Sequence, residues 1–215
     1  MRTLIVCLIL LCFIESGAAE RTDVQLWSTF TVYKQITPLI KSRIGEELKW
    51  RHQVSTFFLD RLDVGVDVKA ASWLTWGLAY KAVHLHQDDT FRRFNVPYGD
   101  IILKWNLKRW VVDARDRFEY WIPPREKRFV RIRQRLRLAP AQPFFKLRAK
   151  PYVAEEYFYD LNASGFKLNR IYLGSTFWTG RLMQVEAYYC LQHLSSDAGW
   201  WRHTIWGTRL SLNLK

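Results

Sequence analysis

The stretch RFVRIRQRLRLAP, residues 128–140, places an arginine at every second position, at Arg131, Arg133, Arg135 and Arg137. The positions between and beside them hold Val130, Ile132, Gln134, Leu136 and Leu138. On an α-helix, residues two apart point in very different directions, so the four arginines would be spread around the axis. On a β-strand they share one face, and the apolar residues share the other. The stretch therefore predicts an extended strand with one cationic face and one apolar face.

A strand with two such faces fits two kinds of sheet. In a soluble sheet the apolar face packs into a core and the arginines meet water. In a membrane barrel the apolar face contacts lipid and the arginines face a polar lumen. The alternation of this one strand does not distinguish the two, so the choice depends on the rest of the chain.

The same alternation recurs along most of the chain. Including the arginine stretch, eleven segments carry it: residues 24–33, 43–51, 61–69, 73–81, 100–108, 111–120, 128–138, 144–153, 170–178, 182–192 and 206–215. Many segments keep the pattern for about ten residues, which is longer than the five or six residues of an average soluble strand. A tilted membrane strand needs about 9–11 residues. The segment lengths therefore favour an all-β, antiparallel transmembrane β-barrel.

The connections between the segments suggest two different rims. Short connections are expected at residues 69–72, 107–110 and 178–181. Longer polar connections are expected at residues 84–100, 161–169 and 193–201. Short periplasmic turns and longer outer loops are typical of bacterial outer-membrane barrels, whose strand numbers are even. We therefore expect ten to twelve strands, with twelve favoured, and the extra break near Pro151, because proline cannot donate to the strand ladder.

The start of the chain has the pattern of a secretory signal peptide. Arg2 supplies the positive charge, residues 4–14 are apolar, and Gly17 to Ala19 offer small residues for cleavage. We expect residues 1–19 to be the signal peptide and residues 20–215 to form one barrel domain. The expected location is the outer membrane of a Gram-negative bacterium.

Composition restricts the classes of partner. Aromatic residues make up 16% of the chain and the net charge is +13. Such a basic excess suits nucleic acid, an anionic membrane surface or an anionic solute, and export makes nucleic acid the least expected of the three. Cys190 is the only cysteine outside the expected signal peptide, so we expect no internal disulfide. No motif for a cofactor or a metal ion is apparent.

Several stretches also resemble a known family. They are DVQLW at residues 23–27, the EYW to RIRQRLRL spacing across residues 119–138, PYVAEEYFYDL at residues 151–161 and GFKLNRIYLG at residues 165–174. These are similar to the bacterial family of domains of unknown function that is numbered 2490. The resemblance covers nearly all of the chain after the expected signal peptide. It implies a β-barrel in the outer membrane, inserted by the outer-membrane assembly machinery, and it implies no established activity.

The strand phases predict which charged side chains face the lumen. The expected basic, anion-contacting residues are Arg115, Arg117, Arg131, Arg133, Arg135, Arg137, Lys146, Arg148, Lys150 and Arg170. Their expected acidic partners in the lumen are Asp113, Glu119 and Glu156. Ladders of arginine and lysine favour the passage of anions. We therefore expect a small anion-preferring channel. The alternative is a plugged structural or adhesive barrel without transport, because small barrels fill their lumen with side chains.

A second alternative is catalytic. His193 and Ser195 lie two residues apart and would share one face of a strand near the rim. This arrangement resembles the His-x-Ser pair of outer-membrane lipid A deacylases, in which the histidine activates the serine. A third group should orient the histidine, and Asp197 is close to it in sequence. We expect no enzyme activity, and a lipid esterase or deacylase is the less favoured reading.

Overall fold

The computed structural model describes residues 22–87, 90–144, 149–161, 166–179, 182–196 and 199–214. The expected signal peptide and two of the expected lumen residues, Lys146 and Arg148, lie outside the described residues. No helix in the described part of the chain is long and apolar enough to cross a bilayer.

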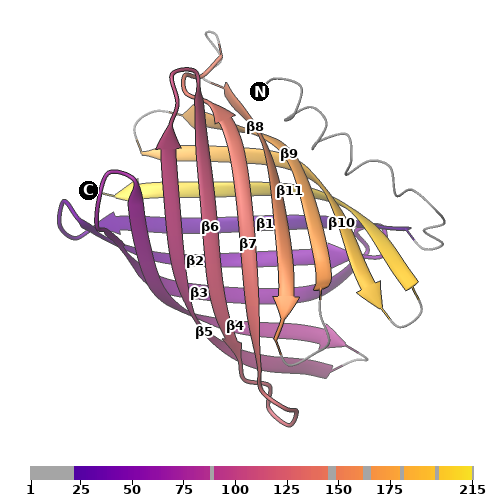
Figure 1. Ribbon diagram of the computed structural model, residues 1–215. Helices are drawn as coiled ribbons and strands as arrows, with labels where there is room; N and C mark the ends of the chain where they lie inside the picture. Colours follow the sequence, from indigo (N-terminus) through magenta and orange to yellow (C-terminus); the bar gives the residue numbers. More distant parts are fainter. Residues whose placement is uncertain are drawn as a thin grey trace.

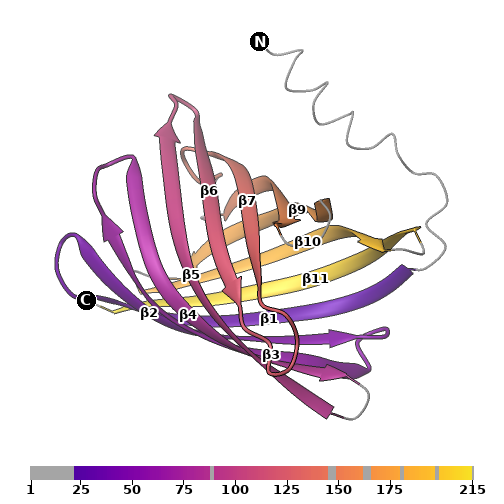
Figure 2. The ribbon, with the colours of Figure 1, turned by 60° about the horizontal axis from the view of Figure 1, so that its bottom comes forward.

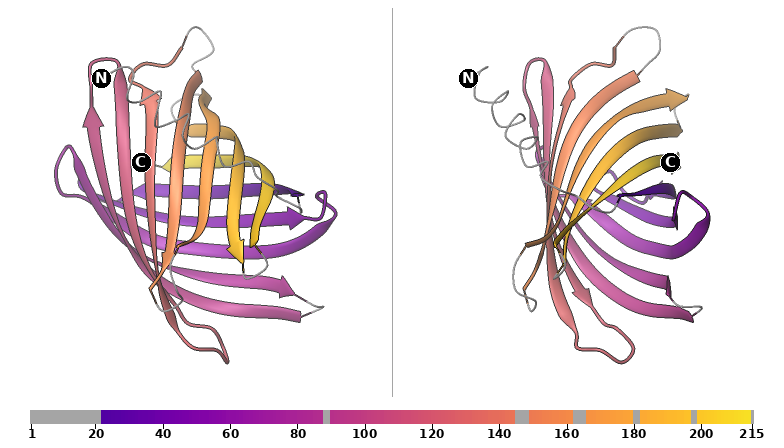
Figure 3. Two further views of the ribbon diagram at one scale, coloured as in Figure 1. Left: turned by 45° about the vertical axis from the view of Figure 1, so that its right-hand side comes forward. Right: turned by 90° about the vertical axis from the view of Figure 1, so that its right-hand side faces the viewer.

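Within these residues the chain forms eleven long strands. They are β1 (Thr22–Gln35), β2 (Ile40–Arg51), β3 (Thr56–Lys69), β4 (Leu74–Gln87), β5 (Thr90–Asn106), β6 (Trp110–Trp121), β7 (Phe129–Pro140), β8 (Ala149–Asp160), β9 (Phe166–Thr179), β10 (Met183–Ser196) and β11 (Gly199–Leu214). Each strand pairs with the next along the chain in antiparallel fashion, and β1 pairs with β11 to close the barrel. Strands β6 to β8 form one wall, and β1 to β3 cross behind them at a steep angle (Figure 1). Figures 2 and 3 show the wall curving round from β1 to β11.

The odd number of strands is accommodated at the seam of the barrel. The expected twelve strands are not found: the eleven alternating segments each become one strand of the described structure. When strands run alternately up and down, the first and the last of an odd number point the same way. The β1–β11 pair is accordingly parallel, with Thr22 opposite Arg202 and Lys34 opposite Leu214. A parallel pair closes every backbone ladder as an antiparallel pair would, so no strand edge is left open.

The short connections expected at residues 69–72 and 107–110 are confirmed at residues 70–73 and 107–109, but two of the expected longer loops are not found. Residues 84–100 were expected to form a loop, yet β4 and β5 extend through them and are joined at residues 88–89. Likewise β10 and β11 extend through residues 193–201 and are joined at residues 197–198. Polar and charged residues in these stretches resemble a loop in composition, but as strand ends they still keep their backbone groups paired.

The two rims are named here by a proline in each. The Pro38 rim contains residues 36–39, 70–73 and 107–109, and the Pro123 rim contains residues 52–55 and 122–128.

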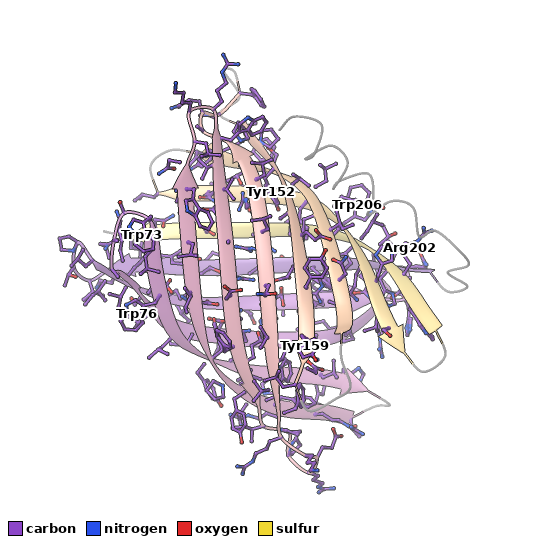
Figure 4. All side chains as sticks on the ribbon, viewed as in Figure 1. Trp73, Trp76, Tyr152, Tyr159, Arg202 and Trp206 are labelled. Carbon is purple, nitrogen blue, oxygen red and sulfur yellow. The ribbon has the colours of Figure 1, made fainter. Side chains whose placement is uncertain are left out.

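The barrel is apolar outside and charged inside. Leu78 and Leu173 point outward from mid-strand and are 64% and 66% exposed. Trp76 and Trp206 are also exposed (Figure 4). Inside, Lys81 and Glu119 are each only 1% exposed. A folded soluble protein buries apolar rather than charged side chains, so this polarity is the inverse of a soluble barrel.

Glycine makes room for tyrosine on the inner wall. Gly207 pairs across strands with Tyr188, and a Cβ added at Gly207 would lie 2.0 Å from the Tyr188 ring. Gly174 has the same relation to Tyr152, with a distance of 2.7 Å. Each tyrosine ring therefore lies flat over a glycine, an arrangement that fills the space left by the missing side chain.

Candidate functional site

Contacts between strands that are not neighbours show which side chains lie inside the barrel. Lys81 on β4 contacts Glu119 on β6, with Nζ and Oε1 2.5 Å apart. Arg137 on β7 donates to Thr176 on β9 over 3.0 Å. Arg170 on β9 lies over the Trp27 ring on β1. Contacts of this kind skip a strand or cross the barrel, so they run through the lumen.

By the same criterion and by strand register, the other predicted lumen residues lie on the inner face. The basic ones are Arg115, Arg117, Arg131, Arg133, Arg135, Arg137, Lys150 and Arg170. The acidic ones are Asp113, Glu119 and Glu156. Lys146 and Arg148 lie outside the described residues. The alternation of the sequence therefore assigned the inner face of these strands, whereas the pairing among the charges could only come from the structure.

The half of the lumen toward the Pro123 rim is closely ion-paired. Arg131 donates to both carboxylate oxygens of Asp160, over 2.6 and 2.9 Å. Arg117 makes the same two-fold contact with Asp100, over 2.7 and 2.8 Å. Bidentate contacts of this kind are the strongest and most directional that arginine forms with a carboxylate. They fix both side chains in place.

A layer of stacked cations and rings crosses this half. We call it the Trp27 layer, and its members are Trp27, Lys49, Phe158, Arg133 and Arg170. Lys49 Nζ lies 3.4 Å from the centroid of the Trp27 ring, and the Arg170 guanidinium lies 4.7 Å from it. Arg133 and Arg170 lie 4.6 and 4.5 Å from the centroid of Phe158. Cation–π contacts of this kind hold the layer together, and the Glu156 carboxylate also links Arg133 to Arg170.

The lumen is hollow from the Trp27 layer, whose Trp27, Lys49 and Arg170 line the first cavity, toward the Pro38 rim. A cavity of about 340 Å³ is lined by charged side chains that include Arg43, Arg135, Arg137 and Arg209. A second cavity of about 520 Å³ lies beside residues 35–41 of the Pro38 rim. The two cavities share Tyr33, Asp67, Gln184 and Ser211 in their walls. The hollow therefore continues from the middle of the barrel toward the Pro38 rim.

Arginine exceeds carboxylate in the wall between the two halves. We call the following six residues the arginine cluster: Arg115, Arg133, Arg135, Arg137, Arg170 and Arg209. All six line the first cavity, of about 340 Å³. Five further carboxylates line the same cavity, at Glu46, Glu47, Asp63, Asp67 and Asp100. Two buried carboxylates, Glu156 and Glu186, contact the arginine cluster directly.

Both carboxylates are shared among several arginines. Glu156 Oε1 lies 2.7 Å from Arg115 Nη2 and 3.0 Å from Arg133 Nη2, and Glu156 Oε2 lies 3.7 Å from Arg170 Nη1. Tyr172 donates to the same carboxylate over 3.1 Å. Glu186 is shared by Arg137 and Arg209. Arg133 also reaches Glu119, but that carboxylate is already paired with Lys81.

Arg135 differs from the rest of the cluster. Among the described residues it has neither a hydrogen bond nor an ion pair, and its buried Nε has no acceptor. Its neighbours in register are Arg115 on β6 and Glu156 on β8. The Glu156 carboxylate is contacted by other arginines, so Arg135 lines the cavity without an ion pair of its own in the described residues.

Several lumen residues were not singled out from the sequence. They are Arg43, Arg61, Lys81, Asp100, Glu186 and Arg209. Each lies in an alternating segment in phase with its inward neighbours, as Arg209 does with Gly207. If the alternation had been used to list every inward charged residue in all segments, as was done for β6 and β7, these residues would have been predicted.

The proposed rim pair lies on the outer face. His193 pairs in register with Asn169 on β9 and with Arg202 on β11, which is labelled in Figure 4. Neither neighbour is a carboxylate, and no hydrogen bond joins His193 to Ser195 in the described part of the chain. Asp197 lies outside the described residues. The described residues therefore supply the histidine with no acidic group to orient it.

On the outer face, the Asp116 carboxylate is hydrogen-bonded to an uncharged side chain, that of Gln134. Asp116 interrupts the apolar positions of β6, and Gln134 on β7 stands opposite to it. Gln134 Nε2 donates to Asp116 Oδ1 over 3.0 Å. This pair satisfies one acceptor of a carboxylate that faces away from the lumen.

Comparison with known proteins gives one positive result. The family model described as protein of unknown function (DUF2490) matches residues 24–203. Searches of curated proteins and of solved structures find no match. The matched region runs from β1 into β11 and so includes almost the whole barrel. The chain therefore belongs to the DUF2490 family of proteins of unknown function.

Proposed function

We propose that this protein is an outer-membrane β-barrel of a Gram-negative bacterium, exported by the signal peptide at residues 1–19, that passes small anions in preference to cations. On this proposal its partners are outer-membrane lipid, the assembly machinery that inserts barrels, and anionic solutes. It needs no cofactor and carries out no catalysis.

The inverted polarity of the barrel supports the membrane location. Outward leucine and tryptophan side chains such as Leu78 and Trp206 would lie against lipid, where apolar surface has no cost. The closed ladder of strands leaves no unpaired edge, as a bilayer requires. The aromatic share of 16% suits a barrel with rings near both interfaces.

The anion preference depends on one observation, the excess of basic over acidic groups beside the first cavity, which is lined by nine arginines and one lysine against seven carboxylates. A lumen wall with surplus positive charge attracts anions and repels cations. The Trp27 layer lies between this cavity and the Pro123 rim, so passage would be narrow and the conductance low.

The Trp27 layer also favours a second candidate function. If its stacked side chains stay in place, the lumen is plugged and the barrel has a structural or adhesive role without transport. The two candidates differ in whether ions cross this layer.

A planar bilayer experiment separates them. The mature chain is refolded and inserted, and the zero-current potential is measured under a potassium chloride gradient. A stable conductance with an anion-selective potential supports the channel. If the wild-type chain is inserted but silent, and Trp27→Ala conducts, the barrel is plugged at the Trp27 layer.

The membrane location has its own test. Leu173 points outward from mid-strand on β9, opposite Val153 and Tyr189. If this face contacts lipid, Leu173→Arg lowers the free energy of unfolding in lipid vesicles by about 2–4 kcal/mol, because a charge then enters the bilayer. The measurement is a urea titration in which tryptophan fluorescence reports the unfolded fraction.

Leu39→Arg is the matched control. Leu39 is 59% exposed but lies in the turn that joins β1 to β2, outside the strands. The same substitution there should leave the free energy of unfolding almost unchanged. Equal, small effects at both positions would argue for a soluble barrel.

A further inference from the structure

We propose that Arg135, together with Arg115 and Arg137, forms a binding site for a phosphate group inside the lumen. The inference deepens the proposed anion preference by naming a chemical class of ligand and a place for it. It rests on the proposed function only in that both use the same cavity.

The first support is the lack of acceptors around Arg135. Four arginines in this wall have a buried Nε without a hydrogen-bond partner: Arg115, Arg133, Arg135 and Arg137. A buried donor without an acceptor is unfavourable, and native proteins contain few of them. Four in one wall of one cavity indicate that acceptors are supplied by something other than the described side chains.

The second support is the local imbalance of charge. Arg135 stands directly opposite Arg115 and is two residues from Arg137 on the same inner face of β7. Arg115 is paired with Glu156, and Arg137 reaches Glu186 only at 3.5 Å. Like charges at this spacing repel one another, and the repulsion is weakly screened away from bulk water. A bound anion removes it.

The third support is the shape of the donors. A guanidinium presents a planar fork of N–H donors that matches two oxygens of a phosphate or a carboxylate. Three forks in the wall of one cavity supply more donors than a single carboxylate has acceptor positions for. A tetrahedral phosphate carries more oxygens and up to two negative charges, so it fits this donor set better.

The fourth support is access. The first cavity, at about 340 Å³, has room for a phosphate and part of the molecule that carries it. Through the walls shared at Tyr33 and Ser211 it continues into the cavity at the Pro38 rim. A soluble phosphorylated solute could therefore reach Arg135 without passing the Trp27 layer.

The test is an isothermal calorimetric titration. Inorganic phosphate is added to the refolded full chain in detergent micelles, in a buffer of low chloride. We expect saturable binding, with affinity reduced about ten-fold or more in Arg135→Gln, since charge-assisted hydrogen bonds are lost. Arg135→Lys keeps the charge and loses the fork, so it should bind with intermediate affinity. If Arg135→Gln does not refold, the Arg135→Lys variant alone tests whether phosphate affinity depends on the guanidinium.

Arg92→Gln is the matched control, because it removes one arginine charge from an exposed pair with Glu126, away from the cavity. Its phosphate affinity should equal that of the wild type. An equal affinity in Arg135→Gln, or no binding to the wild type, overturns the site. Acetate titrated in parallel identifies a carboxylate site if it binds as tightly as phosphate, and that result also overturns the proposal.

The outcome is separable from the proposed function. Phosphate binding that depends on Arg135, in a barrel that carries no current, sustains the site and rejects the channel. An anion-selective current with no phosphate binding supports the channel and rejects the phosphate site.

Discussion

The two halves of strand β7 carry the same repeat but have different surroundings. Arg131 and Arg133, toward the Pro123 rim, each contact a carboxylate within 3.0 Å. Arg137, toward the Pro38 rim, has one carboxylate at 3.5 Å, and Arg135 has none in the described residues. The arginines of the first half are fixed by close ion pairs. The arginines of the second half line the cavity with a distant carboxylate or with no ion pair. An arginine ladder can therefore serve as a brace and as a ligand-facing surface within one strand.

The largest effect is expected at the carboxylate that braces the wall. Glu156 is 2% exposed and contacts three arginines. Glu156→Gln removes the negative charge that they share, keeps one acceptor oxygen, and places an NH2 donor group among buried cations that then lack this counter-charge. The free energy of unfolding should fall by about 3–5 kcal/mol, measured by urea titration in lipid vesicles.

Glu126→Gln is the control for that change. Glu126 lies between β6 and β7 and forms an exposed pair with Arg92, so its loss should change the free energy of unfolding by less than about 0.5 kcal/mol. If Glu156→Gln is as mild as this control, Glu156 does not brace the arginines.

A smaller loss is expected at the braced end of β7. Arg131→Gln leaves Asp160 without its bidentate partner. The Arg131 side chain is partly open to solvent, so water compensates some of the loss. We expect a decrease of about 1–2 kcal/mol in the free energy of unfolding by the same titration. If the decrease equals that of Glu156→Gln, the Arg131–Asp160 pair near the Pro123 rim stabilises the barrel as much as the Glu156 contacts in the middle of the wall.

The smallest effect, with the opposite sign, is expected at Arg135. Arg135→Gln breaks no pair and relieves repulsion from Arg115, so in phosphate-free buffer of low salt it should raise the free energy of unfolding by up to about 1 kcal/mol. The gain should shrink in about 1 M salt, where the screening length is only about 3 Å. Destabilisation by this substitution would mean that Arg135 has a partner after all, and the contrast between the two halves of β7 would disappear.

The sequence predicted much of this barrel because alternation is a local property. The period of two in residues 128–138 sets the inward face of β7 without reference to any other strand. The same rule applied to the other segments gave the β-barrel and the count of eleven segments.

The parts that failed depend on contacts between distant segments. Whether an arginine is paired depends on strands up to three positions away in the barrel, as with Arg137 on β7 and Glu186 on β10. The parallel seam between β1 and β11 joins the two ends of the described chain, so no pattern within either strand reveals it. Residues 84–100 resembled a loop because their composition is polar, although their backbone pairs as strand.

The parallel seam has a consequence for the direction of the chain. Both β1 and β11 begin at the Pro123 rim and end at the Pro38 rim. Thr22 and Leu214 therefore lie at opposite rims of the barrel. In a bilayer this is a sided arrangement: an epitope placed before β1 and one placed after β11 would face different aqueous compartments. A barrel with an even number of strands would return both ends of its chain to one compartment.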